Sequence, residues 1–397
     1  MPLGAVSLLA HAYVGWRLAP ALGSFAAAVA LVALLVVSAL TLPYGLGARR
    51  AGRKRFGAQL AWIGLVGMGL FSSLFVLTVA RDLFLVVIAA VAAALPHAVV
   101  PARFVVPSAQ LVVAAALLVT AWGFANARRT ARVVRIDVPI AGLPTSLDGF
   151  TIAQVSDVHV GPTIKRPYVE AIVDAVNGLD VDLVAITGDL VDGTVHELAD
   201  DVAPFAQLRS REGSLFVTGN HEYYSGVVPW IHELRRLGIG VLLNEHVVVR
   251  RGDAALVVGG VTDFGGGHFD RLHRSDPAGA LAGSPAGAAV RILLAHQPRS
   301  AAAAEAAGFD LQLSGHTHGG QFLPWNFLVR LQQPFTAGLH RWRAMWVYTS
   351  RGTGYWGPPK RLGAPSEIAV LRLVAAPSPV ARAPRAAPRQ ETVARSV

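Results

Sequence analysis

The sequence predicts a chain of two parts, an N-terminal group of apolar membrane-spanning helices and a C-terminal α/β domain. Two observations favour the first part. Hydrophobic residues make up 53% of the 397 residues and charged residues 15%, which is more apolar than an ordinary soluble protein. The long apolar stretches all lie within residues 1–128. The third observation favours the second part: after residue 135, short apolar runs alternate with stretches of helical periodicity.

Three stretches of the N-terminal part have roughly the 20 apolar residues that a membrane-spanning helix needs, namely 23–43, 57–80 and 107–127. The shorter stretch 3–16 is interpreted as a first span. A removed signal peptide is the weaker interpretation, because another span follows at once and no small-residue cleavage site is evident. The stretch 83–95 has only 13 residues and is followed by a proline. It fits a further span or a re-entrant or interfacial segment equally well.

Positive charge is concentrated in the apolar part. Residues 1–135 hold twelve Arg and Lys residues and one acid, Asp82, whereas the rest of the chain is close to neutral. This distribution indicates a topology signal and argues against a nucleic-acid surface. Four spans put the two strongest basic clusters, 49–55 and 128–135, on the cytoplasmic side, whereas five would put one of them outside. We therefore expect about four spans, a location in the cell membrane and a cytoplasmic C-terminal domain.

The C-terminal part has the pattern of an α/β domain. Its predicted strands are the apolar runs 150–156, 181–187, 214–218, 255–261 and 290–295. Helical patterns lie near 166–178, 197–209, 229–237 and 298–307. Because ligands gather at the carboxyl ends of strands in open α/β sheets, the candidate site is the set of residues that follow these runs.

Five short motifs stand at strand ends, in the order SDVHVG, TGDLVDG, TGNHEYY, AHQP and SGHTHGG. They present carboxylate, amide and imidazole groups, which suit Mn, Fe or Zn, and the chain has no cysteine to offer a thiolate. A single motif of this kind is common by chance, but five in succession predict a metal site. The residues concerned are Asp157, His159, Asp189, Asn220, His221, His296, His316 and His318.

These motifs resemble those of the calcineurin-type metallophosphoesterases, whose pattern is D-x-H, G-D-x-x-D, G-N-H-[DE], a lone His and G-H-x-H. The segments LDGFTIAQVSDVHVG and SRGTGYWGPPKRLGAPSEIAVLRL also resemble the bacterial membrane-associated branch of that family. The resemblance implies a metallophosphoesterase fold, a two-sheet β-sandwich flanked by helices. The predicted parts are a transmembrane region (1–128), a basic juxtamembrane linker (129–135), the metallophosphoesterase domain (136–375) and a disordered tail (376–397).

The resemblance also implies two divalent metal ions, Mn, Fe or Zn, which share one bridging carboxylate. Asp189 is the bridge, and His221 is a proton donor that Asp192 orients and charges. The other ligands of the two ions are Asp157, His159 and His318 for one, and Asn220, His296 and His316 for the other.

Local features of the motifs carry two further expectations. Gly188, Gly219 and Gly315 each precede a ligand, where a Cβ would crowd the metals or the backbone needs a positive φ, although ordinary turn glycines also fit. We expect His316 and His318 to lie in extended backbone, so that both point to the same face and serve neighbouring metals.

The function that the resemblance implies is a membrane-anchored phosphohydrolase or phosphodiesterase for a phosphate ester or diphosphate. A lipid-linked substrate is favoured because the spans hold the domain near the bilayer, and chemistry like that of a UDP-diacylglucosamine diphosphatase is one candidate. Two alternatives stay open. A nucleotide or nucleic-acid phosphodiesterase is disfavoured by the near-neutral domain. A sensor that only binds metal and phosphate is disfavoured because binding needs no proton donor. The sequence does not predict an oligomeric state.

Overall fold

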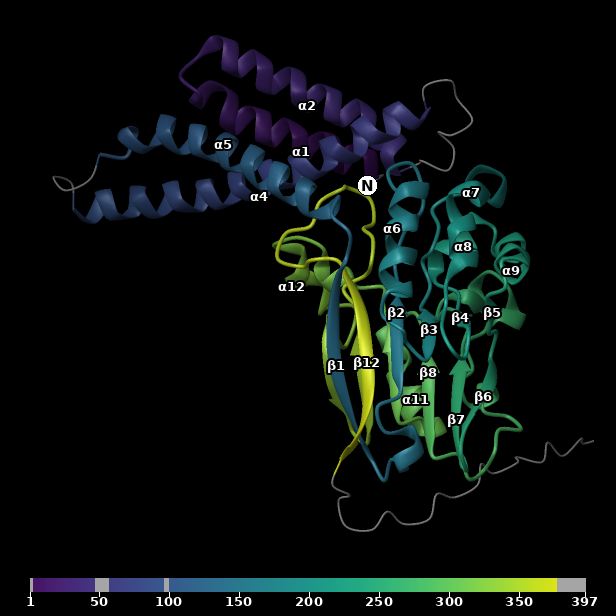
Figure 1. Cartoon of the computed structure of the whole chain (residues 1–397). Coiled ribbons are helices and arrows are strands. Elements are labelled where there is room, and N and C mark those ends of the chain that lie inside the picture. The colour runs from purple at the N-terminus through teal and green to yellow at the C-terminus, as the bar shows by residue number, and fades with distance from the viewer. Residues whose placement is uncertain (1–2, 47–56, 96–99, 377–397) are drawn as a thin grey trace, which may run out of the picture.

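The computed structural model describes residues 3–46, 57–95 and 100–376. Figure 1 shows long N-terminal helices that lie across one end of an α/β domain. This is the predicted order of an apolar helical region followed by an α/β domain. The basic loop at 49–55 and nearly all of the predicted tail (376–397) lie outside the described residues.

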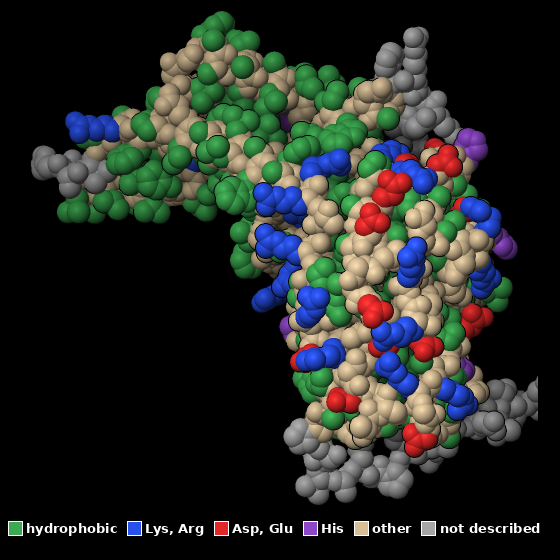
Figure 2. Space-filling model, viewed as in Figure 1, with side chains coloured by type: hydrophobic (Ala, Val, Ile, Leu, Met, Phe, Trp, Pro, Cys, Tyr) green, Lys and Arg blue, Asp and Glu red, His purple; other side chains and the backbone are tan. Residues whose placement is uncertain are grey.

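The described N-terminal helices are α1 (Leu3–Leu18), α2 (Phe25–Leu46), α4 (Gly57–Ala94) and α5 (Ala102–Ala127). Three segments are long and apolar enough to cross a membrane, namely Phe25–Gly45, Gly57–Ala94 and Ala102–Ala127. Hydrophobic side chains cover much of this part of the molecule in Figure 2, whereas charged side chains are spread over the α/β domain. Helix α1 has 16 residues, so its length of about 24 Å falls short of a ~30 Å hydrocarbon core. Its role as a fourth span stays a prediction.

Helix α4 runs without a break through the segment 83–95, which the sequence left open. The segment is therefore neither a separate span nor a re-entrant loop. Residues 81–94 contain no Gly or Pro, so nothing in them interrupts a helix. With 38 residues, α4 is about 57 Å long, nearly twice the thickness of a hydrocarbon core. Only part of α4 can therefore lie within a bilayer.

The one acid of this region, Asp82, is paired inside the helix bundle. Arg17 donates two hydrogen bonds of 2.8 Å to its carboxylate, and the Tyr13 hydroxyl donates one of 2.7 Å. The neighbouring Arg81 donates to Ser108 Oγ at 3.0 Å. Pairing makes charges tolerable among apolar helices, and these bonds connect α1, α4 and α5.

Two six-stranded sheets form the centre of the α/β domain. The first has the order β1 (Arg132–Ala141), β12 (Glu367–Ala376), β2 (Thr151–Val155), β3 (Leu183–Ile186), β4 (Ser214–Phe216) and β5 (Gly240–Val241). The second has the order β10 (Gly338–Trp342), β11 (Met345–Thr349), β9 (Leu311–Ser314), β8 (Val290–Leu294), β7 (Ala254–Gly260) and β6 (Glu245–Arg251). Strands β2, β3 and β4 are parallel, as are β7, β8 and β9. The carboxyl ends of each set therefore meet at one edge of their sheet.

Hydrophobic packing holds the layers together. Between the sheets, Leu183 and Leu215 of the first belong to the same buried cluster as Leu256, Ile292 and Leu313 of the second. Three helices pack on the outer face of the first sheet, namely α6 (Arg166–Asn177), α7 (Val195–Val202) and α9 (Val227–Arg236). Two helices pack on the outer face of the second sheet, namely α10 (Pro277–Ala280) and α11 (Ala301–Ala307). The structure thus has the predicted two-sheet sandwich flanked by helices.

The predicted linker is shorter in the structure. Strand β1 begins at Arg132, which pairs with Glu367 of β12, so residues 132–135 belong to the sheet and 128–131 connect it to α5. The basic residues Arg132 and Arg135 suggested a linker. They lie on an edge strand, where exposed charges are common. At the other end, β12 includes Ala376, the first residue of the predicted tail.

The helix bundle is docked onto the α/β domain near the end of the chain. Lys360 Nζ donates to the Gly69 carbonyl oxygen of α4 at 3.0 Å, and the Arg361 backbone N–H donates to the Gly123 carbonyl oxygen of α5 at 2.9 Å. A Cβ at Gly123 would lie 2.7 Å from Lys360 Cγ, so the close approach requires glycine. Trp325, in α12 (Trp325–Val329), adds a hydrogen bond of 2.8 Å to a serine of α4.

Candidate metal centre

The residues of the candidate site follow the carboxyl ends of neighbouring parallel strands in both sheets. The first sheet contributes the residues after β2, β3 and β4, where helix α8 (Asn220–Ser225) begins, and the second contributes those after β8 and β9. The structure brings together six of the seven side chains that the sequence assigned to metals, namely Asp157, His159, Asp189, His296, His316 and His318. The seventh residue, Asn220, directly precedes His221, whose backbone N–H donates to Asp189 Oδ1 at 2.8 Å.

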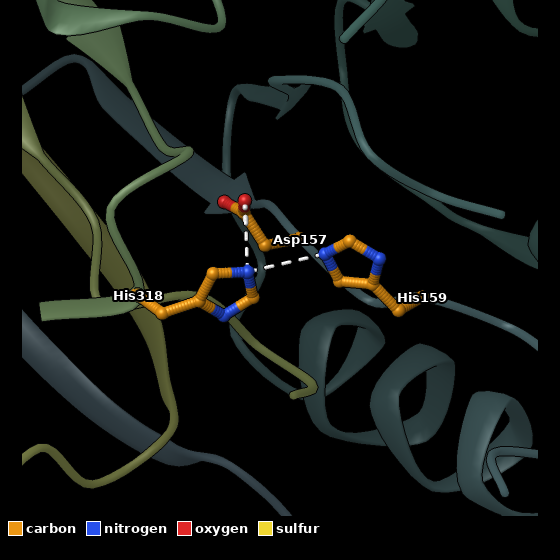
Figure 3. A group of neighbouring side chains, drawn as sticks. All are labelled: Asp157, His159 and His318. Atoms are coloured by element: carbon orange, nitrogen blue, oxygen red, sulfur yellow. Dashed lines mark hydrogen bonds and ion pairs between the residues drawn. The ribbon is translucent and has the colours of Figure 1, made fainter. Parts of the chain in front are cut away.

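Asp157, His159 and His318 form a first group, which Figure 3 shows with the three side chains turned toward one another. His318 Nε2 lies 3.1 Å from His159 Nε2 and 3.5 Å from Asp157 Oδ1. All three residues are buried. Two imidazole nitrogens and a carboxylate oxygen that face a common point are the ligand set of a divalent cation.

A second group contains Asp189, His296 and His316. His296 Nε2 lies 3.1 Å from Asp189 Oδ2 and 3.2 Å from His316 Nδ1. The same Asp189 oxygen is 3.8 Å from His159 Nε2 of the first group. The Asp189 carboxylate therefore lies between the two groups, where the sequence predicted a bridge.

The pKa values of the two buried carboxylates reflect these neighbours. Burial raises the pKa of Asp189, but the nearby His296 and His221 outweigh it and hold that pKa well below its ordinary value. Burial raises the pKa of Asp157. Bound cations stabilise carboxylates that are buried in this way, because they offset the cost of burying the negative charge.

The donor atoms fit divalent metal ions. Asn220 Oδ1 is buried and has no hydrogen-bond partner within the described residues, although a buried amide oxygen is costly to leave unpaired. His159 Nε2 and His318 Nε2 face each other at hydrogen-bond distance, an arrangement that a metal between them would explain without a proton on either atom. The residues that are present thus match the ligand types of Mn, Fe or Zn.

His221 and Asp192 form a hydrogen-bonded pair beside the two groups, through Nδ1 and Oδ1. Asp192 Oδ2 also lies 3.2 Å from His159 Nδ1. Burial alone would lower the pKa of His221, but the carboxylates of Asp189 and Asp192 outweigh it and raise the pKa to about 9. The ligand atoms of His221, His159 and Asp189 also lie close enough together to bind one metal ion. The geometry is therefore compatible with His221 as a metal ligand as well as a proton donor.

The chain is similar to proteins of one known family over the domain that contains the candidate site. Residues 150–320 match the calcineurin-like phosphoesterase family. An uncharacterized metallophosphoesterase of Aquifex aeolicus is 32% identical over 245 residues, which cover 61% of this chain and 91% of that protein. The chain belongs to the calcineurin-like phosphoesterase family. The matched region contains all five motifs of the site.

Two further relatives combine this calcineurin-like domain with membrane segments. Proteins described as "Transmembrane protein with metallophosphoesterase domain" are 42% identical over 267 residues in Bos taurus and 39% identical over 265 residues in Danio rerio. Each match covers 64% of this chain and 60% of the relative. These descriptions and the three apolar segments indicate a membrane protein.

The calcineurin-like site has an unusual backbone. Five of its residues have positive φ, at values from 51° to 70°, namely Asp157, His159, Asp189, His316 and His318. The expectation of extended backbone at His316 and His318 is therefore wrong: both are left-handed and the intervening Thr317 is helical. Left-handed non-glycine residues cost free energy, and such strained residues cluster at functional sites.

Two glycines of the motifs avoid steric clashes at the carboxylates. A Cβ at Gly219 would lie 2.2 Å from Asp189 Oδ1, and one at Gly315 would lie 2.1 Å from Asp157 Oδ2. Both distances are far below any van der Waals contact, so a side chain at either position would clash with the carboxylate itself. Crowding of the metals, as the sequence suggested, stays a prediction. Gly188 has a φ of 85°, so the need for positive φ applies there.

Glu222 and Arg361 support the site and were not singled out from the sequence. The Glu222 carboxylate accepts backbone hydrogen bonds from Gly219, Asp189 and Leu190 at 2.6 to 3.0 Å, which fixes the loop that carries Asp189 against the start of α8. The buried Arg361 guanidinium donates to the His318 carbonyl oxygen at 2.9 Å. The signal for Glu222 was present, because it occupies the last position of the G-N-H-[DE] motif.

Aromatic side chains surround His221. Its ring centroid lies 5.4 Å from that of Tyr224 and 5.9 Å from that of Trp356. Tyr224, Tyr355 and Trp356 line one cavity with His221. Tyr223 instead is buried against His273, with which it shares a hydrogen bond of 2.9 Å.

Proposed function

We propose that the chain is a membrane-anchored phosphohydrolase or phosphodiesterase that uses two divalent metal ions to cleave a phosphate ester or diphosphate. The Asp189 carboxylate between two groups of ligand-type side chains is the observation that carries the proposal. The chain spans 60% of the length of the two transmembrane relatives, so activity and substrate are inferred from this chain's own residues.

Each ion would have three ligands of its own, and both would share Asp189. The mixed oxygen and imidazole set favours Mn, Fe or Zn. When bound, the two ions would lower the pKa of the attacking water and offset charge on the phosphate oxygens. The proposed ligands are Asp157, His159 and His318 for one ion, and Asn220, His296 and His316 for the other.

His221 acts on the leaving group in this proposal. As the water oxygen forms a bond to phosphorus, the bond from phosphorus to the leaving oxygen breaks, and His221 Nε2 gives that oxygen a proton. Asp192 holds Nδ1–H and so fixes the orientation and tautomer of the imidazole. Since Asp192 also approaches His159, it positions the proton donor relative to a metal ligand.

A lipid-linked phosphate or diphosphate is the proposed substrate class, and chemistry like that of a UDP-diacylglucosamine diphosphatase stays one candidate. Its support is the docking of the helix bundle at the end of the domain where the candidate site lies. A nucleotide or nucleic-acid phosphodiesterase stays the second candidate, because the family match names phosphoesterases without naming a substrate. The His221–Asp192 pair argues against a sensor without catalysis, because binding alone requires no proton donor.

Two narrower assignments belong to the same proposal. The charge distribution supports a cytoplasmic catalytic domain. Membership of a bacterial membrane-associated branch is supported by the closing segment of the domain, although the relatives include animal as well as bacterial proteins.

The test is purification in detergent with metal analysis, followed by a parallel screen of p-nitrophenyl phosphate, bis-p-nitrophenyl phosphate and lipid diphosphates. We expect about two metal ions per chain and hydrolysis that chelation abolishes. A protein that holds two ions but hydrolyses none of these esters would support the sensor.

A further inference from the structure

A groove runs from the candidate metal centre along the ends of helices α2 and α4. A cavity of about 140 Å³ is lined by His159 and His221 on one side and by Gly45 of α2 and Leu65 of α4 on the other. A second cavity, of about 320 Å³, shares Pro162 and Asp192 with the first. The two cavities therefore adjoin, and together they form what we term the α4 groove.

The two walls of the α4 groove differ in chemistry. The wall from the α/β domain includes His159, Asp192 and His221, which offer charge and hydrogen bonds. The wall from the helix bundle is apolar and built of small or aliphatic residues, namely Gly45, Gly57, Ala58, Ala61 and Leu65. A ligand that fills the groove must be polar on one side and apolar on the other.

The position of His221 says which part of a substrate faces this groove. His221 is the proposed proton donor, so the leaving oxygen must lie within hydrogen-bond reach of its Nε2. The rings of Tyr224 and Trp356 flank His221 and are both about half exposed, at 44% and 45%. The group attached to the leaving oxygen therefore meets aromatic side chains and the apolar wall of α2 and α4.

The apolar wall is held in place by defined contacts. Lys360 and Trp325 of the α/β domain donate hydrogen bonds to α4 at 3.0 and 2.8 Å, and Gly64 of α4 packs so closely on α2 that a Cβ there would lie 2.3 Å from the Thr41 carbonyl oxygen. These helices, α2 and α4, belong to the part of the molecule that carries the apolar surface in Figure 2. The groove therefore lies next to that apolar surface.

We propose that the α4 groove binds the leaving group of an amphiphilic phosphate, a phosphoester or diphosphate in which the departing group carries an aliphatic chain. The phosphate lies at the metal centre, and the chain lies against α4. This inference rests on the proposed function, because it is that function that puts the phosphate at the metal centre. It adds that the membrane helices form part of the substrate site and select for chain length.

The test uses Ala58→Trp. Ala58 is an exposed residue in the first turn of α4 that lines the larger cavity, so an indole there fills the groove without disturbing a packed core. The matched control is Gln59→Trp, because Gln59 is also exposed and lines neither cavity. Metal content, measured for both variants, shows whether the metal centre is intact.

The substrates are butyl and dodecyl phosphates and diphosphates in nonionic detergent, compared by kcat/KM. We expect the unaltered protein to prefer the dodecyl compound at least tenfold, about the effect of burying two methylene groups. Ala58→Trp should remove most of this preference, whereas Gln59→Trp should keep both the preference and the rate on the butyl compound. Equal rates on both chain lengths, or a preference that survives Ala58→Trp, would overturn the inference.

Binding of butyl and dodecyl phosphonates, which cannot be hydrolysed, is measured in parallel by calorimetry. Binding measured without turnover distinguishes a failure of the proposed function from a failure of the groove. A protein without turnover on any ester, whose chain-length-dependent binding is lost in Ala58→Trp, would contradict the proposed function and support the groove. Turnover of the butyl esters without chain-length-dependent binding would support the function and contradict the groove.

Discussion

Lys360 of the α/β domain reaches the backbone of the helix bundle, where its ammonium nitrogen lies 3.0 Å from the carbonyl oxygen of Gly69. The side chain is almost fully buried, at 2% exposure. The next residue, Arg361, turns the other way and donates to the carbonyl oxygen of the candidate ligand His318. Two consecutive residues thus connect the N-terminal helices to the candidate metal centre.

Lys360→Ala should weaken the docking of the bundle on the α/β domain. The change removes a buried aliphatic stem and leaves a cavity, which costs about 2–4 kcal/mol for side chains of this size. Such a loss lowers the melting temperature by roughly 2–5 °C in a protein of this length, measurable by differential scanning fluorimetry in detergent. Lys360→Met keeps the stem and should lose less. Arg372→Ala, at an exposed ion pair, is the control, and an equal effect there would contradict a special role for Lys360.

Asp189→Asn should remove most of the activity and lower the occupancy of both metal sites. Asp189 is the only side chain proposed to touch both ions, and an amide cannot supply the second anionic oxygen. Metal content by mass spectrometry, set beside turnover, measures both effects. Asp180→Asn is the matched control, because Asp180 is highly exposed and lies outside the site. Two ions per chain and normal turnover in Asp189→Asn would show that the bridge is assigned wrongly.

The sequence predicted the strands that carry the site because each is a short apolar run followed by a motif. Local pattern could not reveal strand β1, which pairs with β12 from the opposite end of the domain. Edge position made Arg132 and Arg135 resemble a linker. Pairing between segments that are distant in sequence depends on tertiary context that a local pattern does not contain.

The same limit applies inside the site. The identity of the ligand residues followed from the motifs, but the left-handed backbone of His316 and His318 did not, since residues of this type usually avoid positive φ. No motif singled out Lys360, and nothing local shows that its acceptors are 287 to 291 residues away. The contribution of α4 to the groove was invisible for the same reason.

The cytoplasmic location of the catalytic domain can be tested with single cysteines, because the chain has none of its own. Cysteines at Gly52 and at Thr130 should both be shielded from an impermeant thiol reagent in intact cells. The reason is that both positions lie in basic clusters, which stay on the cytoplasmic side. Labelling after permeabilisation is the control for accessibility. Labelling of intact cells at Thr130 alone would instead place the catalytic domain outside.

His221→Ala tests whether this residue donates a proton or holds a metal. The side chain is bonded to Asp192 through Nδ1 and lies 3.9 Å from Asp189 through Nε2, so both roles fit the distances. If His221 donates a proton, the variant keeps both ions and loses about 10²–10⁴ in turnover, the usual contribution of general acid catalysis.

The leaving group distinguishes the two roles further. A p-nitrophenolate departs with little protonation, whereas an alkoxide needs a proton as the bond to phosphorus breaks. The loss in His221→Ala should therefore be smaller for p-nitrophenyl phosphate than for an alkyl phosphate, when both are measured as kcat at saturating substrate. Asp192→Asn should show the same dependence on the leaving group, because an amide no longer holds the imidazole charged. Loss of one ion in His221→Ala would make the residue a ligand, and an equal loss for both esters would exclude the proton donor.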